Sequence, residues 1–161
     1  MCGRDQGRNR AFSLIELIIV VVIIGIIAAI AIPRLSRGTA GAADSALIGD
    51  LAVLRSALDL YETEHTGSVP TLANYVAAMT QYTDIGGTTN ATKSGAFIYG
   101  PYLRAIPPLP VGTAKGETVV KVPPADGVAG AGWVYDAATS TIIANCAAGE
   151  TDDSGKPYIS Y

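Results

Sequence analysis

The chain has 161 residues, a length that suits one folded domain with an appended element. Apolar residues make up 49% of it and charged residues 16%, and much of this imbalance lies in one N-terminal block, which indicates a membrane segment rather than an unusually apolar globular core. The formal net charge is −3, and no basic face with interleaved aromatic residues is present, so nucleic-acid binding is not expected.

The N-terminal block has the features of a membrane-spanning helix. Residues 17–32 carry no charged side chain, and the apolar run reaches back to Phe12 with one interruption at Glu16. A helix rising about 1.5 Å per residue over residues 12–33 can cross about 30 Å of hydrocarbon. Arginines precede the block, and the positive-inside rule predicts that they stay in the cytoplasm.

An ordinary signal peptide is the alternative interpretation of the same block. The tripeptide Ala29-Ile30-Ala31 fits a signal-peptidase site, and the mature chain would then be a secreted binding domain that starts at Ile32. Glu16 argues against this alternative, because a carboxylate costs about 2.5 to 3.5 kcal/mol at the bilayer centre and a signal sequence does not need one.

The run Arg10-Ala11-Phe12-Ser13-Leu14-Ile15-Glu16 resembles the prepilin cleavage and methylation motif of the type IV pilin-like family. The resemblance implies that residues 1–11 are a leader peptide, that a prepilin peptidase cuts between Ala11 and Phe12, and that Phe12 becomes N-methylated. The chain departs from the family pattern at Ala11, where the family prefers glycine.

The resemblance also implies how such a helix assembles. Cleavage would create an α-amino group, which generally titrates near pH 7.7 to 8.0, and Glu16 would pair with this amine on its own or a neighbouring subunit. Pro33 is placed as in the family, where it bends or locally opens the helix. Small residues that permit close helix approach are Gly25, Ala28, Ala29 and Ala31.

Residues 34–66 predict an amphipathic continuation of the helix. Apolar positions recur at alternating steps of four and three, at Leu47, Leu51, Leu54, Leu58 and Tyr61. The helix is expected to end near His65 to Gly67, with Gly67 as the C-terminal cap. His65 is the sole histidine, and it is interpreted as a helix-end residue.

Residues 67–161 predict a globular region. A short helix is expected over Leu72 to Tyr82, with Tyr75, Val76 and Met79 on one face. Residues 86–95 are expected to form a loop, and residues 117–122 a short strand. Residues 132–136 and 141–145 predict a hairpin, whose Trp133 and Tyr135 cover the helix. The fold class is therefore α+β, with one long helix packed on a small antiparallel sheet.

Two further segments resemble the major pseudopilins of type II secretion systems, namely Gly100-Pro101-Tyr102-Leu103-Arg104 and Gly132-Trp133-Val134-Tyr135-Asp136. This resemblance implies a ladle-shaped pilin fold and a structural subunit of a pseudopilus, stored in the inner membrane with its C-terminal region in the periplasm. Implied partners are copies of itself, minor pilins or pseudopilins, the peptidase and an inner-membrane assembly platform. A type IV pilus subunit for adhesion, motility or DNA uptake is the alternative.

Cysteine use bears on that choice. Cys2 and Cys146 lie on opposite sides of the apolar block, so Cys146 is expected to be a lone buried thiol in or beside a strand. True pilins often close their C-terminal region with a disulfide, which one periplasmic cysteine cannot form.

No phosphate-binding loop, zinc spacing or catalytic triad is recognised, so the chain is not expected to be an enzyme and requires no cofactor. Calcium is the one metal considered. Its candidate ligands are Glu150, Asp152 and Asp153, because carboxylate oxygens suit Ca²⁺ and major pseudopilins bind calcium in this region. A solvated acidic tail is the alternative interpretation.

Overall fold

The computed structural model describes residues 12–161, without the side chains of residues 32–40. Its contacts divide the chain into two units, which meet at Thr39 and Ala40 and are described separately below. The predicted leader, residues 1–11, lies outside the described residues.

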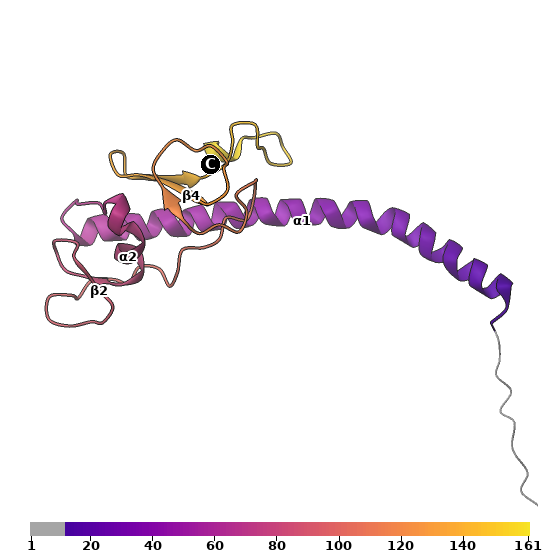
Figure 1. Ribbon diagram of the computed structural model, residues 1–161, viewed down its shortest axis with the longest axis horizontal. Coiled ribbons are helices and arrows are strands. Elements are labelled where there is room, and N and C mark those ends of the chain that lie inside the picture. Colours follow the sequence, from indigo (N-terminus) through magenta and orange to yellow (C-terminus); the bar gives the residue numbers. More distant parts are fainter. Residues whose placement is uncertain (1–11) are drawn as a thin grey trace, which may run out of the picture. The chain divides into compact units, whose positions relative to one another are not determined.

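One helix, α1, runs from Leu14 to Glu64 and enters both units (Figure 1). Its 51 residues correspond to about 76 Å at about 1.5 Å per residue. The predicted long helix is therefore confirmed to within two residues at its start. In the second unit the buried face of α1 carries the predicted stripe, and its members expose 2% or less of their surface: Leu47, Leu51, Leu54, Leu58 and Tyr61.

The C-terminal end of α1 differs in detail from the prediction. The backbone N–H of Gly67 donates to the carbonyl of Glu62 over 2.8 Å, and the residue in the preceding left-handed position is Thr66, with φ of 57°. This pattern is a Schellman motif, in which the first left-handed residue is usually glycine. Thr66 takes that conformation here, and Gly67 follows it with φ of 82°.

A short helical segment follows the turn. It consists of η1, Leu72–Asn74, and α2, Tyr75–Thr80. Tyr75, Ala78 and Met79 are buried, whereas Val76 is 46% exposed. The prediction that Val76 shares the buried face was wrong. Ala78 and Met79 follow Tyr75 by three and four positions and so lie on its side of the helix, whereas Val76, the next residue, points to another side.

Two small sheets complete the globular region. In the first sheet, β1 (Tyr82–Thr83) pairs antiparallel with β2 (Thr89–Asn90), so residues 86–95, predicted as a loop, include a strand. The second sheet has the order β3-β4-β5, with bounds Val120–Lys121, Trp133–Asp136 and Thr141–Ala144. Strands β4 and β5 form the predicted hairpin.

Strand β3 pairs parallel with β4, so this sheet is mixed rather than purely antiparallel. A parallel pair needs a long connection instead of a tight turn, and residues 122–132 provide it. The α+β class is confirmed.

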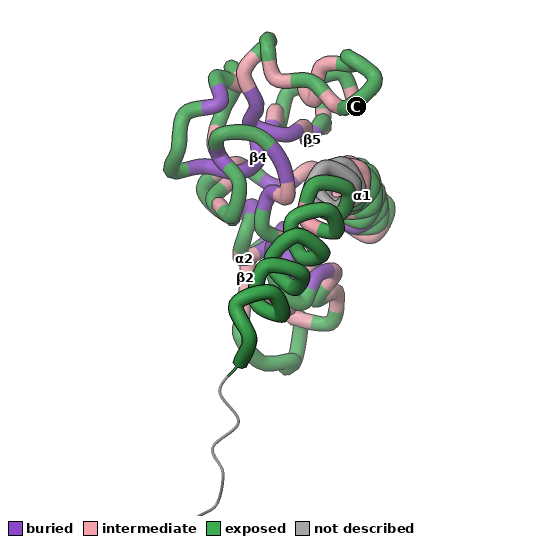
Figure 2. The backbone as a smooth tube through the Cα atoms, turned by 90° about the vertical axis from the view of Figure 1, so that its right-hand side faces the viewer, coloured by how far each residue is buried: buried purple, intermediate pink, exposed green. Residues whose placement is uncertain are grey.

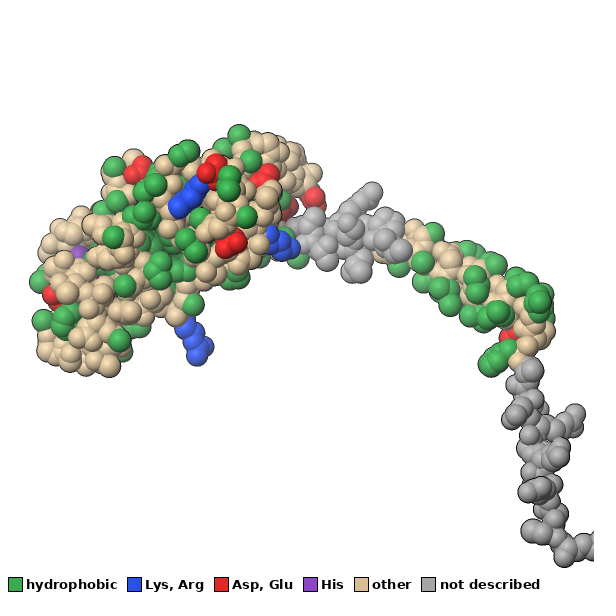
Figure 3. Space-filling model, in the orientation of Figure 1, with side chains coloured by type: hydrophobic (Ala, Val, Ile, Leu, Met, Phe, Trp, Pro, Cys, Tyr) green, Lys and Arg blue, Asp and Glu red, His purple; other side chains and the backbone are tan. Residues whose placement is uncertain are grey.

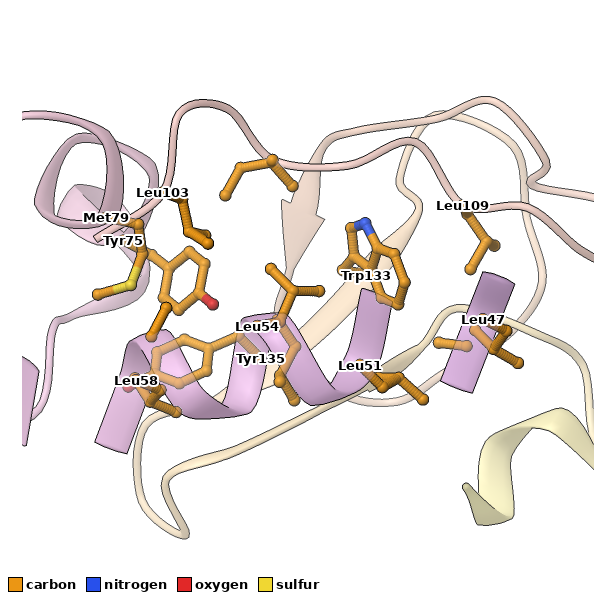
Figure 4. Packing of buried hydrophobic residues seen from close by; sticks show 14 of the residues in the cluster. Leu47, Leu51, Leu54, Leu58, Tyr75, Met79, Leu103, Leu109, Trp133 and Tyr135 are labelled. Carbon is orange, nitrogen blue, oxygen red and sulfur yellow. The ribbon is translucent and has the colours of Figure 1, made fainter. Parts of the chain in front are cut away.

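The core lies between α1, α2 and the sheet of β4 and β5 (Figures 2 and 4). Trp133 and Tyr135 point from β4 toward the leucines of α1, and both expose 1% or less. The indole Nε1 of Trp133 donates to the carbonyl of Pro107 over 2.8 Å, and the hydroxyl of Tyr135 donates to that of Pro70 over 2.9 Å. Both polar atoms are therefore satisfied inside the core.

Candidate functional site

The first candidate surface is the apolar N-terminal half of α1. Residues Leu14–Ala31 have a mean hydropathy of 3.2, none of them is buried, and they are long and apolar enough to cross a membrane. Figure 3 shows hydrophobic side chains along this half of the helix, with backbone and other atoms between them. Phe12 lies just before the helix and is 85% exposed.

Glu16 is exposed in the first turn of α1. It is the single acidic residue between positions 12 and 31, and it follows Phe12 by four positions, which is about one helical turn. A carboxylate near a helix N-terminus interacts favourably with the unpaired backbone N–H groups there. The predicted pairing of Glu16 with the new amino group of a processed subunit stays a prediction.

The other residues predicted for processing and assembly are only partly described. Ala11, on the leader side of the predicted cut, lies outside the described residues. The helical assignment of α1 continues through position 33, but the side chain of Pro33 is not described. The expected bend at Pro33 therefore stays a prediction.

A second candidate surface, which the sequence analysis missed, is the outer face of α1 in the globular unit. We define this outer face as Ile48, Gly49, Ala52, Val53, Ser56 and Leu60. Its large members are about half exposed, at 51% for Ile48, 54% for Val53 and 49% for Leu60. Part of it, together with Ala57 and Tyr102, lines an open groove of about 370 Å³.

None of these six residues is charged, although a helix face in water normally carries charged or polar side chains, and Asp59, which follows Ser56 by three positions, is the charged residue that shares their side of the helix. Gly49 also lies in the interior of the helix, where glycine costs up to about 1 kcal/mol relative to alanine, and a Cβ built there would meet no atom within 4 Å. Packing within the chain therefore does not explain Gly49. The signal for this outer face in the sequence was the recurrence of uncharged residues at these helical positions, with Asp59 as the exception.

Two of the three calcium candidates, Glu150 and Asp152, are held in separate hydrogen-bonded turns, and the backbone N–H of the third, Asp153, donates to the carboxylate of Asp44 at 3.4 Å. The carboxylate of Glu150 accepts from the backbone N–H of Thr113 at 2.6 Å and from that of Ala147 at 2.7 Å. Asp152 accepts from the backbone N–H groups of Ser154 and Lys156, each at 2.8 Å. In the described part of the chain, no three acidic, histidine or cysteine side chains gather as a metal site.

Hydrogen bonds also explain the acidity of these two carboxyls. Burial alone would raise the pKa of Glu150, but the bonds from Thr113 and Ala147 bring it below its usual value. The pKa of Asp152 is lowered mainly by the hydroxyl of Tyr161, which donates to it, and then by Ser154. Both carboxylates organise the C-terminal loop.

His65 lies at the end of α1, as predicted, but it is fully buried. Its ring stacks on Tyr61 with centroids 3.8 Å apart, and its Nδ1 lies 2.8 Å from the Tyr61 carbonyl. Cys146 is a buried free thiol two residues after the end of β5, as expected, and burial raises its pKa to about 12. Neither group is placed as a nucleophile or general base.

Comparison with known proteins gives one match. Residues 6–32 match the family model described as the prokaryotic N-terminal methylation motif, a structural motif rather than an enzyme class. This match includes Ala11, Phe12 and Glu16. No curated protein and no solved structure matches the chain.

Proposed function

Because the chain carries the prepilin-type N-terminal motif of type IV pilin-like proteins, we propose that it is a filament subunit that is cut before Phe12 and assembles with copies of itself. The observation that carries the proposal is the position of this motif at the start of an exposed apolar helix. Such a helix can first anchor the subunit in the bacterial inner membrane and later pack against its neighbours.

Glu16 gives the assembly its register in this proposal. Cleavage before Phe12 leaves a cationic amine, and methylation of the nitrogen keeps the charge. A charge buried without a partner among packed apolar helices is strongly unfavourable, whereas a paired charge is tolerated. Subunits therefore stop at the axial stagger that brings each Glu16 to an amine.

The outer face of α1 supports assembly of the globular region as well. Its half-exposed Ile48, Val53 and Leu60 and its small residues permit another helix to approach closely. Because this face belongs to the same helix as the apolar half, both surfaces serve one assembly built around α1.

The specific filament we propose is a type II secretion pseudopilus. The resemblance of residues 100–104 and 132–136 to major pseudopilins supports it, and so does the buried free thiol of Cys146. By the positive-inside rule, the arginines before the span support a cytoplasmic leader and a periplasmic globular region in this proposal. Partners in this proposal are minor pseudopilins, a prepilin peptidase and an inner-membrane assembly platform.

Intact mass and N-terminal sequencing of the protein from native membranes test the processing step. The expected result is a chain that begins with N-methylated Phe12. A Glu16→Gln variant should be processed in the same way but should assemble poorly, because it is neutral and nearly the same size. A mature chain that begins at Ile32 would refute the proposal in favour of an ordinary signal peptide.

A deletion strain separates the two kinds of filament. Loss of export of folded proteins into the medium, with surface motility and DNA uptake unchanged, is the result expected for a pseudopilus. The reverse pattern would identify a type IV pilus subunit, which is the second candidate.

A further inference from the structure

The connection between β3 and β4 exposes apolar side chains on a surface loop. We call residues 122–131 the valine loop. Val122 in it is 56% exposed and Val128 is 63% exposed. No other large apolar side chain described in residues 40–161 is as exposed as Val128. Loops in water are normally polar, so this exposure needs a reason.

A fully buried asparagine fixes the shape of the valine loop. The Oδ1 of Asn145 accepts from the backbone N–H groups of Asp126 at 3.1 Å and Gly127 at 3.3 Å. Its Nδ2 donates to the carbonyls of Val128 at 3.1 Å and Ala131 at 2.7 Å. The four hydrogen bonds hold the loop in one conformation, and ordering a surface in advance lowers the entropic cost of binding.

An ion pair adds to this order. The Nζ of Lys121 lies 2.5 Å from a carboxylate oxygen of Asp126, and the same oxygen accepts from the backbone N–H of Val128 at 3.0 Å. The side chain of Asp126 remains 43% exposed. The valine loop therefore presents an apolar tip beside a carboxylate that is paired with Lys121 in the same chain and is still partly exposed.

A groove between α2 and β3, the strand that precedes the valine loop, has the complementary character. It measures about 540 Å³ and is mainly apolar. We call it the α2–β3 groove, lined by Val76, Thr80, Arg104, Ile106, Val119 and Val120. Val76 and Val119 stay about half exposed, at 46% and 52%.

Arg104 is the charged member of this lining. Within residues 12–31 and 41–161, the structure shows no carboxylate in ion-pair contact with it, because the ion pair found there joins Lys121 and Asp126. The groove thus presents an apolar surface with a cation beside it, which matches an apolar loop whose carboxylate, paired with Lys121, keeps an exposed side for a second cation.

We propose that the valine loop of one copy of this chain docks in the α2–β3 groove of the next copy, with Asp126 facing Arg104. The proposal rests on the proposed filament. An open filament needs a heterologous contact, in which two different patches on each subunit are complementary, and this loop and groove are two such patches. One loop is a small contact, so it acts together with the packing of α1.

Cross-linking between copies tests the contact in the full chain. Two variants are co-expressed, one with Val128→Cys and the other with Val76→Cys, both with Cys2→Ser. A short bis-maleimide is added to assembled filaments. The expected result is a covalent dimer that needs both cysteines. The control pair replaces Val128→Cys with Ile98→Cys, which is exposed to a similar degree at 52% and should give no dimer.

Introducing a charge at the tip of the loop gives a second test of the contact. Val128→Lys places a cation against Arg104 and should lower the assembled fraction about tenfold, since like charges in an interface oppose association. Val128→Leu, which keeps the tip of the loop apolar, should leave the assembled fraction near the wild-type value. An unchanged melting temperature of the unassembled chain would show that neither change acts through folding.

The outcomes separate this contact from the filament itself. Filaments that form without the Val128–Val76 cross-link, or a Val128→Lys variant that assembles like the wild type, would overturn the contact and leave the proposed function intact. A wild-type chain that keeps residues 1–11 and never assembles would overturn both.

Discussion

At the scale of single residues, Tyr75 has a buried hydroxyl without a hydrogen-bond partner among the described residues. Its ring packs beside that of Tyr135, with centroids 4.5 Å apart. Burial raises the pKa of Tyr75 well above its usual value, so the hydroxyl is neutral at all relevant pH values. An unpaired buried hydroxyl is unfavourable.

We therefore expect Tyr75→Phe to raise the free energy of unfolding by about 1 kcal/mol, because it removes a buried polar group that has no partner. Tyr135→Phe is the matched control, since it deletes the bond to the Pro70 carbonyl and should lower the same quantity by about 1 kcal/mol. Urea denaturation of the processed chain in detergent micelles measures both. Equal losses in the two variants would show that the Tyr75 hydroxyl has a partner.

The thiol of Cys146 gives a second prediction at this scale. With a pKa of about 12, it carries a thiolate fraction of about 10⁻⁴ at pH 8, and it is fully buried. Iodoacetamide should leave Cys146 unmodified in the folded processed chain and should modify it readily in urea. Labelling of the folded chain at the rate of a free cysteine, measured by mass spectrometry, would contradict its buried position.

Several residue placements could not be read from the sequence. His65 was recognised as a helix-end residue, but its burial depends on Tyr61 and Tyr99, and Tyr99 comes from a distant part of the chain. Asn145 was predicted only as a member of a strand. Its four loop contacts come from residues 14 to 19 positions earlier, and no local pattern indicates them.

At the scale of elements, the connection between β3 and β4 depends on Asn145. Asn145→Ala leaves buried N–H and carbonyl groups of the valine loop unpaired, so we expect a loss of about 2 to 3 kcal/mol in the free energy of unfolding. Asn90→Ala is the control, because its side chain accepts only from residue 92 in an exposed turn. That change should cost less than about 0.5 kcal/mol. Similar losses in both would refute this role for Asn145.

The C-terminal loop should be sensitive to acid. Hydrogen bonds, chiefly from Tyr161, lower the pKa of Asp152 in the folded chain, whereas its unfolded pKa is about 3.9. The stabilisation is therefore complete well above pH 3.9 and is lost as the pH falls below that value toward the lowered native pKa.

Thermal unfolding between pH 7 and pH 2 measures this effect. The Asp152→Asn variant should show a shallower decline below pH 4 than the wild type, because it lacks the titrating group. Parallel curves for the two proteins would mean that the carboxylate contributes no acid sensitivity.

Elements were predicted best where the pattern was long and periodic. The stripe from Leu47 to Tyr61 fixed the buried face of α1, and the β-prone runs on either side of residues 137–140 fixed the hairpin. Strand β3 was expected, but its parallel orientation was not. Strand β2 has only two residues, Thr89 and Asn90, whose pairing depends on β1 rather than on their own propensity.

At the scale of the whole molecule, two exposed surfaces of α1 are expected to support one assembly. Val53→Glu places a charge on the outer face, where Val53 is 54% exposed. The variant should fold and be processed normally, and its assembled fraction should fall about tenfold or more, because burial of an unpaired carboxylate is costly.

Ile98→Glu is the matched control, since it adds the same charge at a similarly exposed apolar residue outside this face. Sedimentation of sheared filaments measures the assembled fraction. If both variants lose assembly equally, the loss is caused by the change in net charge and not by the position of the charge on the outer face.

The continuity of α1 also has a mechanical consequence. The same hydrogen-bonded helix contains the apolar segment near Glu16 and the leucines that anchor the globular core, with no loop between them. A tensile load applied to α1 at one end reaches the core through the helix backbone, which it loads in series with the Leu47 to Tyr61 packing. The hydrogen-bond ladder lacks one donor on the way, because Pro33 has no backbone N–H. The subunit can therefore pass a pull through α1 to its core without first extending a compliant linker.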